Sequence, residues 1–306
     1  MREPTAEEKN VVAGVRISHP ERVLDPTGAT KLALARYYEA IGPWMLPHVF
    51  GRPLTLVRWA EGKETEKGGV YLRHARAWGP AALRRVRIRE KTKVGEYLVV
   101  ESIEALVSLA QMDILEIHTW NTTVDDIERP DRVVFDLDPG PGVSWRAIAG
   151  AARHVRRALE GEGLESFVKT TGGKGLHVVA PLVRDRGWDE CLAFSRDVVR
   201  RIAREDPARY VLTMKKSARR GCIFIDYLRN GRANTSVAAY STRARPNAPV
   251  SVPLAWDEID DIDPASFTMD AVLDRMRRLD RDPWRPAQGM LKERRTWARR
   301  SKAVRR

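Results

Sequence analysis

The sequence predicts an α/β domain built on a mixed or mostly antiparallel sheet that is flanked by helices. Helical and strand-like segments alternate along the chain, and several strand-like segments follow one another directly, as in hairpins. The chain has 306 residues, of which 43% are hydrophobic, enough for one large core or for two closely packed subdomains. No repeat or low-complexity block interrupts this pattern. We expect one folded unit over residues 1–286 and a basic tail or linker over residues 287–306.

The spacing of apolar residues predicts the elements in order. A turn followed by Thr30 opens the first helix, and Ser144 opens a later helix that Gly161 or Gly163 closes. Short apolar runs bounded by turn residues mark the strands. In chain order we expect a helix over 30–46, a strand over 53–59, a helix over 102–112, strands over 114–120 and 132–138, a helix over 144–163, strands over 167–171 and 176–182, a helix over 191–205, a strand over 222–228 and a helix over 269–279.

Charge and composition limit the possible functions. Lys and Arg outnumber Asp and Glu by 54 to 41, and the net charge of +13 favours a phosphate-rich partner such as nucleic acid, although a basic enzyme of another kind has the same balance. The charged N-terminus and the lack of a long apolar run predict neither a signal peptide nor a membrane partner. Cys191 and Cys222 lack the spacing of zinc sites. We expect a cytoplasmic protein, in the cytosol or the nucleoid.

Two aspartates one residue apart end the apolar run over 132–138. Because side chains alternate faces along a strand, Asp136 and Asp138 are expected on one face, close to the strand end at Pro139. We expect this strand end to be a ligand-binding rim, as in open α/β sheets. Two carboxylates about 4 Å apart repel by about 4 kcal/mol at an effective dielectric of 20. A shared proton or a divalent cation would relieve that repulsion. The alternative is that the two aspartates form only a turn or a helix cap and have no catalytic role.

A third carboxylate, Asp226, lies inside the apolar run over 222–228. An acid in such a run is costly unless it is paired or bound to a metal ion. Three aspartates on two strands suit a site for two cations about 3.5–4 Å apart, which stabilise the attacking and leaving oxygens of phosphoryl transfer. The sequence therefore predicts a two-metal site.

A glycine-rich turn with a lysine lies between the strands expected over 167–171 and 176–182. Backbone N–H groups of such a turn form an anion-binding nest, and Lys174 adds a positive charge for a phosphate. The turn is not a Walker A loop, since a strand follows it, and a plain hairpin also needs glycine. Alternation predicts that His177 shares a face with the ligand of this turn, and that His118 opposes Ile117. For both histidines a hydrogen-bonded core position is the alternative.

The segments "HTWN", "FDLDPGPG", "TTGGKGLHVVAPL", "IFIDYLRN" and "AAYSTRARPNAPVSVPLAWDEI" occur in a characteristic order and spacing. They resemble the polymerase module of bacterial end-joining DNA ligase D, in the archaeo-eukaryotic primase superfamily, over about residues 15–286. The resemblance implies a primase-polymerase-like fold for the catalytic domain. It also implies template-directed nucleotidyl transfer at gaps and double-strand breaks in non-homologous end joining.

The same resemblance implies cofactors and partners. It suggests two divalent metal ions, with Mn²⁺ preferred to Mg²⁺, and NTP or dNTP substrates with a preference for ribonucleotides. DNA ends and gapped duplexes with a 5′-phosphate would be the partners, together with a Ku-type protein and a DNA ligase. The chain shows no ligase lysine motif or nuclease module, so it is either a module of a larger ligase or a stand-alone relative.

Residue by residue, the resemblance implies specific roles. Val70 and Tyr71 replace two adjacent phenylalanines that contact the template base; Tyr71 retains a stacking ring and Val70 does not. Thr171 replaces a serine, and Arg22 replaces a lysine. The implied metal ligands are Asp136, Asp138 and Asp226; the active-site histidine is His118; the nucleotide-binding residues are Thr171, Lys174, His177 and Arg243; the residues for the 5′-phosphate are Arg22 and Lys31; and the further DNA contacts are Arg52, Arg58, Tyr71 and Arg219.

Two rival functions belong to other classes. The run "VVFDLD" is also typical of haloacid-dehalogenase-type phosphatases, but there it usually lies near the N-terminus and continues with Gly-Thr, whereas here it lies mid-chain and continues with Pro-Gly. A DNA-end-binding scaffold without catalysis is the non-enzymatic alternative. The retention of all three aspartates argues against that scaffold.

Overall fold

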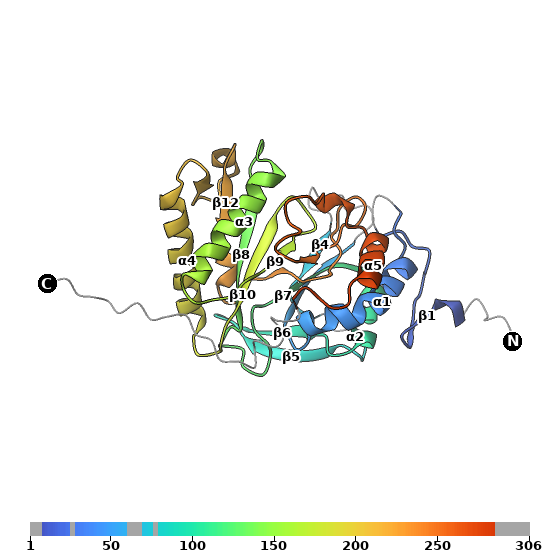
Figure 1. The fold of residues 1–306 in the computed structure, drawn as a ribbon. Coiled ribbons are helices and arrows are strands. Elements are labelled where there is room, and N and C mark those ends of the chain that lie inside the picture. Colours follow the sequence, from blue (N-terminus) through green and yellow to red (C-terminus); the bar gives the residue numbers. More distant parts are fainter. Residues whose placement is uncertain (1–7, 25–27, 60–68, 76–78, 285–306) are drawn as a thin grey trace.

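Two β-sheets form the centre of the molecule, with helices on the outside (Figure 1). The computed structural model describes residues 8–24, 28–59, 69–75 and 79–284. The six-stranded sheet has the order β11 (Tyr210–Val211), β12 (Ile223–Asp226), β8 (Arg132–Pro139), β10 (Leu176–Pro181), β9 (Phe167–Thr170) and β14 (Pro253–Leu254). All its neighbours pair antiparallel except β11 and β12.

The second sheet has four strands in the order β13 (Ser236–Val237), β7 (Ile114–Thr119), β3 (Leu54–Arg58) and β4 (Val70–Leu72). Its strands are also antiparallel. Two separate hairpins complete the described strands: β1 (Val11–Val12) with β2 (Val15–Arg16), and β5 (Arg84–Arg89) with β6 (Val94–Val99). These antiparallel sheets with flanking helices confirm the predicted fold class.

In the described part of the chain, five α-helices cover the two sheets. Helices α3 (Trp145–Glu160) and α4 (Trp188–Glu205) pack on the six-stranded sheet, on the side where Figure 1 draws them together. Helices α1 (Lys31–Val49) and α2 (Ile103–Gln111) pack against each other beside the four-stranded sheet, and α5 (Met269–Arg278) contacts α1. Four 3₁₀ turns complete the described elements: η1 (Glu8–Asn10), η2 (Lys216–Arg219), η3 (Leu228–Asn230) and η4 (Pro264–Ser266).

Local sequence signals account for most of the helix ends. The hydroxyl of Thr30 accepts a hydrogen bond from the Ala33 N–H at the start of α1, and Ser144 caps α3 in the same way through Ala147. Gly161 ends α3, as predicted. Helix α4 begins at Trp188, three residues earlier than predicted, where the side chain of Glu190 returns to the Gly187 N–H.

The packing of β8 sends its two sets of side chains in opposite directions. Val133, Phe135 and Leu137 are fully buried, and β8 contacts α3 and α4. The alternate residues, which include Asp136, therefore face away from these helices, as the strand period requires. None of the helices in the described part of the chain has the length and apolar character needed to cross a bilayer. The tail predicted over 287–306 lies outside the described residues.

Candidate active site

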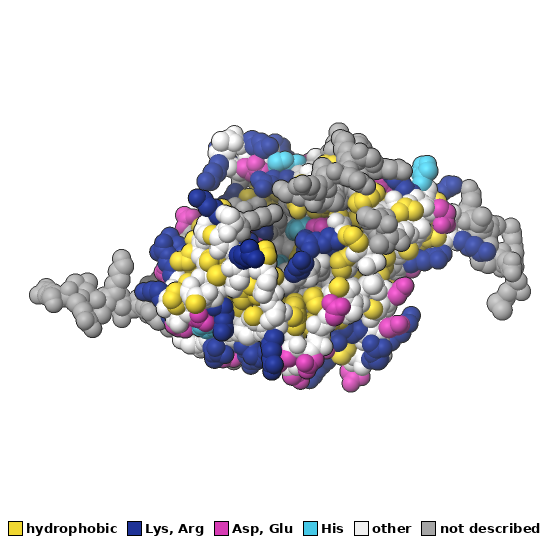
Figure 2. All heavy atoms as spheres, turned by 90° about the horizontal axis from the view of Figure 1, so that it is seen from above, with side chains coloured by type: hydrophobic (Ala, Val, Ile, Leu, Met, Phe, Trp, Pro, Cys, Tyr) yellow, Lys and Arg dark blue, Asp and Glu magenta, His cyan; other side chains and the backbone are white. Residues whose placement is uncertain are grey.

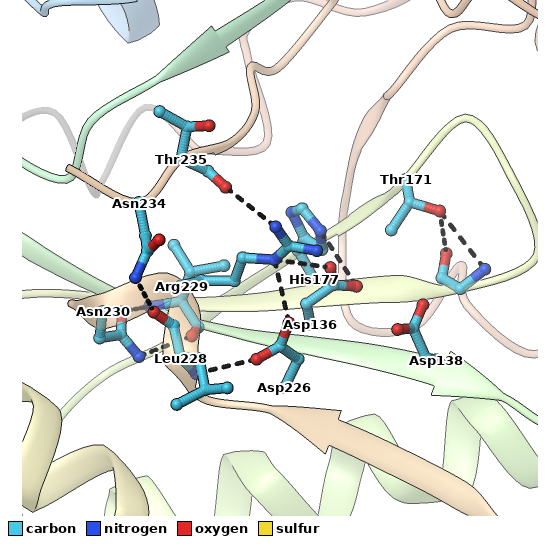
Figure 3. Close-up of polar contacts among 12 residues, drawn as sticks. Asp136, Asp138, Thr171, His177, Asp226, Leu228, Arg229, Asn230, Asn234 and Thr235 are labelled. Carbon is cyan, nitrogen blue, oxygen red and sulfur yellow. Dashed lines mark hydrogen bonds and ion pairs between the residues drawn. The ribbon is translucent and has the colours of Figure 1, made fainter. Parts of the chain in front are cut away.

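A row of ionisable side chains crosses four neighbouring strands of the six-stranded sheet. Strand pairing sets Asp226 on β12 opposite Asp136 on β8, Asp136 opposite His177 on β10, and His177 opposite Lys169 on β9. Directly paired residues project to the same face of a sheet. Figure 3 shows Asp136, Asp138, Asp226 and His177 on one side of the strands, with the helices on the other. The structure thus brings the three predicted aspartates together with His177.

The position of this row differs from the sequence argument in one respect. We expected the aspartates at the carboxyl rim of the sheet, as in parallel α/β proteins. Strand β8 instead runs antiparallel to both neighbours, so that the sheet has no common carboxyl edge at this point. The acids lie on the face of the sheet. Seen from above in Figure 2, a histidine and acidic side chains are visible in a hollow between Lys and Arg side chains.

Two arginines neutralise the acids. Arg229 Nε lies 3.3 Å from Asp136 Oδ2 and 3.2 Å from Asp226 Oδ2, while Arg219 Nη1 lies 3.3 Å from Asp138 Oδ2. Arg219 also places its guanidinium over the Phe224 ring. Among the residues that the structure describes, no three Asp, Glu, His or Cys side chains are already grouped as metal ligands. The carboxylates are therefore close on one face but are engaged with arginine.

The pKa values differ among the three acids. Burial and the nearby charge of Asp136 raise the pKa of Asp138 to about 6, and burial also raises the pKa of Asp226. Burial acts in the same direction on Asp136, but its contacts with His177 and Arg229 outweigh burial and lower its pKa. An additional cation would lower the raised pKa values of Asp138 and Asp226, since it favours the ionised carboxylates. The donor set, three oxygen-bearing side chains on a partly buried face, fits hard divalent cations.

His177 is held as a neutral ring between Asp136 and Lys169. Its Nε2 lies 3.3 Å from Asp136 Oδ1, and its buried Nδ1 has no hydrogen-bond partner among the described residues. Burial and the charge of Lys169 lower the pKa of His177 to about 4. Lys169 is itself buried, which lowers its pKa well below the usual value, and its Nζ donates to Ser251 Oγ at 2.6 Å. The unpartnered Nδ1 leaves His177 one hydrogen-bonding position for a ligand.

Glu116 on β7 organises the opposite side of the site. Its Oε2 lies 2.7 Å from His118 Nε2, its Oε1 lies 3.1 Å from Arg243 Nε, and it accepts a hydrogen bond from the Ala244 N–H. Burial opposes its ionisation, yet the contacts with His118 and Arg243 lower the pKa of Glu116 to about 2. The ionised Glu116 thus holds two of the predicted site residues, His118 and Arg243, in place. The sequence pattern does not single out Glu116, although it stands two residues before His118 and so on the same strand face.

The glycine-rich turn closes over the end of β8. Thr171 Oγ1 lies 3.2 Å from the Gly175 carbonyl oxygen, and a Cβ on Gly175 would overlap the carbonyl oxygen of Leu137 (Figure 3). Arg243 donates a hydrogen bond to the Thr171 carbonyl oxygen, and Lys174 is exposed. Gly172 has φ +64°, which favours glycine. The turn therefore lies against β8, holds Arg243 through a hydrogen bond and leaves Lys174 exposed; its predicted role in binding phosphate stays a prediction.

A second cationic group lies at the other end of the four-stranded sheet. Arg22 Nη1 and Arg58 Nη2 lie 3.2 Å and 3.1 Å from Asp113 Oδ2, and Lys31 Nζ lies 3.3 Å from Asp113 Oδ1. Three residues that the sequence assigned to DNA contacts are therefore neighbours. Asp113 was not among the predicted residues, because nothing in the sequence marks the residue that precedes β7 as their partner.

Two further DNA contacts predicted from the sequence have different surroundings. Tyr71 on β4 is 57% exposed, and its ring centroid lies 6.3 Å from that of His118, so it is available for stacking beside the site. Arg52 is only 5% exposed, and both of its Nη atoms donate to Asp131, at 2.8 Å and 2.7 Å. In this structure the donors of Arg52 are used in a buried ion pair, which does not support the predicted DNA contact.

Comparison with known proteins shows which family the chain belongs to. The model of the LigD primase-polymerase domain matches residues 30–284. The chain belongs to the LigD primase-polymerase family. Primase-polymerase domains are nucleotidyltransferases, and this membership confirms both the resemblance and the enzyme class predicted from the sequence. The phosphatase alternative loses its support.

Relatives and a solved structure agree with the LigD assignment. The chain is 39% identical over 277 residues to the multifunctional non-homologous end joining protein LigD of Pseudomonas aeruginosa, with 89% of this chain and 32% of the relative covered. Identity to the LigD of Mycolicibacterium smegmatis is 35% over 265 residues, with 86% and 34% covered. The chain thus spans about a third of the length of these relatives.

The polymerase domain of Mycobacterium tuberculosis ligase D, solved in complex with DNA, superimposes with a TM-score of 0.81 at 32% identity. The match covers 90% of this chain and 98% of that domain. A superposition of this extent confirms the primase-polymerase-like fold.

Proposed function

We propose that this LigD primase-polymerase domain is a template-directed polymerase that extends primer 3′ ends at gaps and double-strand breaks in non-homologous end joining. The observation that carries the proposal is the cross-strand row of Asp226, Asp136 and His177, with Asp138 on the same face. Phosphoryl transfer needs closely spaced oxygen ligands beside cationic phosphate contacts, and this face provides both. A polymerase of this kind would act at the bacterial nucleoid.

Two divalent ions, Mn²⁺ rather than Mg²⁺, are the proposed cofactors, and Asp136, Asp138 and Asp226 would hold them. When bound, such ions supply Lewis-acid stabilisation of charge on the phosphate oxygens. Arg229 and Arg219 now occupy the acid oxygens, at 3.2–3.3 Å. The guanidinium groups of these arginines must move away from the carboxylate oxygens before the carboxylates can bind cations.

The other side chains of the site would bind and orient the nucleoside triphosphate, with ribonucleotides preferred to deoxynucleotides. Thr171, Lys174, His177 and Arg243 would hold the triphosphate chain, since the turn and Arg243 are already joined by a hydrogen bond. His118, fixed by Glu116, would contact the nucleotide from the opposite side. Orientation by such fixed groups places the α-phosphate for attack by the primer 3′-hydroxyl.

DNA ends and gapped duplexes are the proposed macromolecular partners. Tyr71 would stack on a template base, a contact worth about 1–3 kcal/mol, and Arg219 would contact the DNA near Asp138. Arg22, Lys31 and Arg58 would recognise the 5′-phosphate across a gap. A Ku-type protein and a DNA ligase would act on the same ends.

Primer extension on a gapped duplex with a recessed 5′-phosphate tests the proposal. We expect wild-type protein to extend the primer, faster with Mn²⁺ than with Mg²⁺ and with ribonucleotides than with deoxynucleotides. Asp136→Ala and Asp138→Ala should each abolish extension and leave binding to the phosphorylated gap nearly unchanged. Equal extension by either variant would refute the assignment. DNA binding by a wild-type protein that incorporates no nucleotide would favour the scaffold alternative.

A further inference from the structure

Asp113 stands at the centre of the second cationic group. It is 3% exposed, and its backbone has φ +62°, a conformation that Asp and Asn adopt more readily than most residues. Its carboxylate contacts Arg22, Lys31 and Arg58, which come from the loop before α1, the first turn of α1 and the end of β3. One buried carboxylate therefore joins three cations from separate parts of the chain.

The backbone around Asp113 holds this group in place. The Trp59 N–H donates to the Asp113 carbonyl oxygen at 2.9 Å, and the Lys31 N–H donates to the Arg22 carbonyl oxygen at 2.8 Å. Three like charges at this spacing repel one another unless an anion lies between them. Burial lowers the pKa of Lys31, and the Asp113 carboxylate opposes that effect. Without the carboxylate, the three cations would have no common anchor among the described residues.

The cationic excess of this group faces outward. The side chains of Arg22 and Arg58 are 34% and 32% exposed, so part of each guanidinium lies at the surface, while Asp113 lies beneath them. Asp113 is the carboxylate that all three cations contact, and phosphate oxygens suit the exposed parts of Arg22 and Arg58. Bidentate arginine contacts are well suited to phosphate oxygens.

The position of the group relative to the active site fits a phosphate across a short gap. Asp113 directly precedes β7, and His118 follows five residues later on that strand. At about 3.3 Å per residue the two lie about 17 Å apart along β7, which equals about five base-pair steps of 3.4 Å. Arg58 also pairs with Val70, the neighbour of Tyr71. The group thus lies on the same two strand pairs as the exposed Tyr71 ring and His118.

We infer that Asp113 is a positioning residue that holds Arg22, Lys31 and Arg58 together as a preformed site for the 5′-phosphate of a gapped DNA. The inference rests on the proposed function, because it assumes that the domain binds such gaps. Asp113 touches neither DNA nor nucleotide; it acts through the three cations. Its removal should therefore change the recognition of the phosphate and leave nucleotide incorporation intact.

Two substitutions remove the carboxylate and keep the backbone conformation. Asp113→Asn has nearly the same shape and tolerates positive φ, and Asp113→Gly favours positive φ without strain. The matched control is Asp197→Asn on α4, whose side chain is 70% exposed and lies on the helix layer behind the six-stranded sheet. It changes the net charge by the same amount at a distance from both groups.

Fluorescence anisotropy measures the affinity of each protein for two gapped duplexes. One duplex carries a 5′-phosphate at the gap and the other carries a 5′-hydroxyl, and they are otherwise identical. Extension of an open primer–template without a downstream strand is measured in parallel. We expect wild type and Asp197→Asn to prefer the phosphorylated gap. Both Asp113 variants should lose about tenfold of that preference, or about 1.4 kcal/mol, and extend the open primer at the wild-type rate.

The possible results separate the positioning role of Asp113 from the proposed polymerase function. A folded Asp113→Asn or Asp113→Gly that keeps the full preference would refute the positioning role. A stronger preference would also refute it, because the carboxylate would then compete with the phosphate. Wild-type protein that extends primers without any preference for the phosphate overturns the inference and leaves polymerisation standing, whereas wild-type protein that incorporates no nucleotide overturns the proposed function itself.

Discussion

At the scale of single residues, the site is set by charges that compensate one another. Asp136, Asp138 and Asp226 are paired with Arg229 and Arg219, and Glu116 is paired with His118 and Arg243. Buried charges are tolerated when they are paired and hydrogen-bonded. The sequence marks the three aspartates, because an acid in an apolar run is conspicuous. It does not mark their partners, since only the folded chain shows which strands are neighbours.

Glu116 gives a prediction at this scale. Glu116→Gln removes the anion that holds His118 and Arg243, so we expect the KM for the nucleotide to rise about tenfold, equivalent to about 1.4 kcal/mol, with a smaller change in kcat. Steady-state primer extension measures both constants. The conservative substitution of an exposed acid on another element, Asp274→Asn, should change neither. A KM equal to that of wild type would show that Glu116 is not needed to place these groups.

The same variant should show a defined pH dependence. The pKa of Glu116 is lowered from 4.5 to about 2 in the folded protein, so its ion pairs stabilise the fold above about pH 4.5 and this contribution is lost as the pH falls towards 2. The difference in Tm between wild type and Glu116→Gln should therefore be largest near neutral pH. It should shrink between pH 4.5 and pH 2. Thermal unfolding followed by circular dichroism across this range measures it; a constant difference would contradict the assignment.

At the scale of elements, the antiparallel surroundings of β8 decide where the acids lie. The sequence predicted β8 and β12 closely, because continuous apolar runs identify buried strands. It did not predict the β5–β6 hairpin, although Val86 and Ile88 alternate with arginines in its first strand, Arg84–Arg89, which carries arginine at four of its six positions. The strand order could not be predicted from the sequence either. The row formed by Asp226, Asp136 and His177 depends on that order, so it could not be predicted.

The glycine-rich turn gives a prediction at the scale of elements. A Cβ at position 175 would overlap the backbone of Leu137 on β8, and a backbone neighbour moves less readily than a flexible side chain. Gly175→Ala should therefore displace the turn, lower stability by about 1–3 kcal/mol and weaken nucleotide binding. Urea unfolding and nucleotide titration measure the two effects.

Gly150→Ala on α3 is the matched control for this turn. A Cβ at Gly150 meets no atom within 4 Å, so the change should leave nucleotide binding intact and stabilise the helix slightly. If Gly175→Ala behaved like this control, the close approach of the turn to β8 would be unimportant for the site.

At the scale of the whole molecule, contacts between residues that are far apart in the chain hold the fold together. Asp282 Oδ2 lies 2.8 Å from His48 Nε2 in α1 and accepts a hydrogen bond from Tyr240 at 3.0 Å. Trp284 packs with Phe167 and donates from Nε1 to the Val168 carbonyl oxygen at 2.9 Å. Residues 282–284 therefore join α1 to the six-stranded sheet. The sequence resemblance, which ended at about residue 286, included this closure without explaining it.

Asp282 provides the prediction at this scale. Asp282→Asn replaces a buried charged acceptor, so we expect a loss of about 1.5–3 kcal/mol in the free energy of unfolding. Urea denaturation measures that loss. Asp263→Asn, at the start of η4 on the surface, is a control that should cost much less. A value for Asp282→Asn within error of wild type would mean that this contact does not hold the terminal residues.

The pairing of arginines with the acids bears on how the protein matures. A cluster of bare carboxylates would delay folding until a cation arrived, and the yield of folded protein would then follow the supply of divalent ions. Here Arg229 and Arg219 already fill that electrostatic need. A newly made chain can thus reach its final shape before any divalent ion binds.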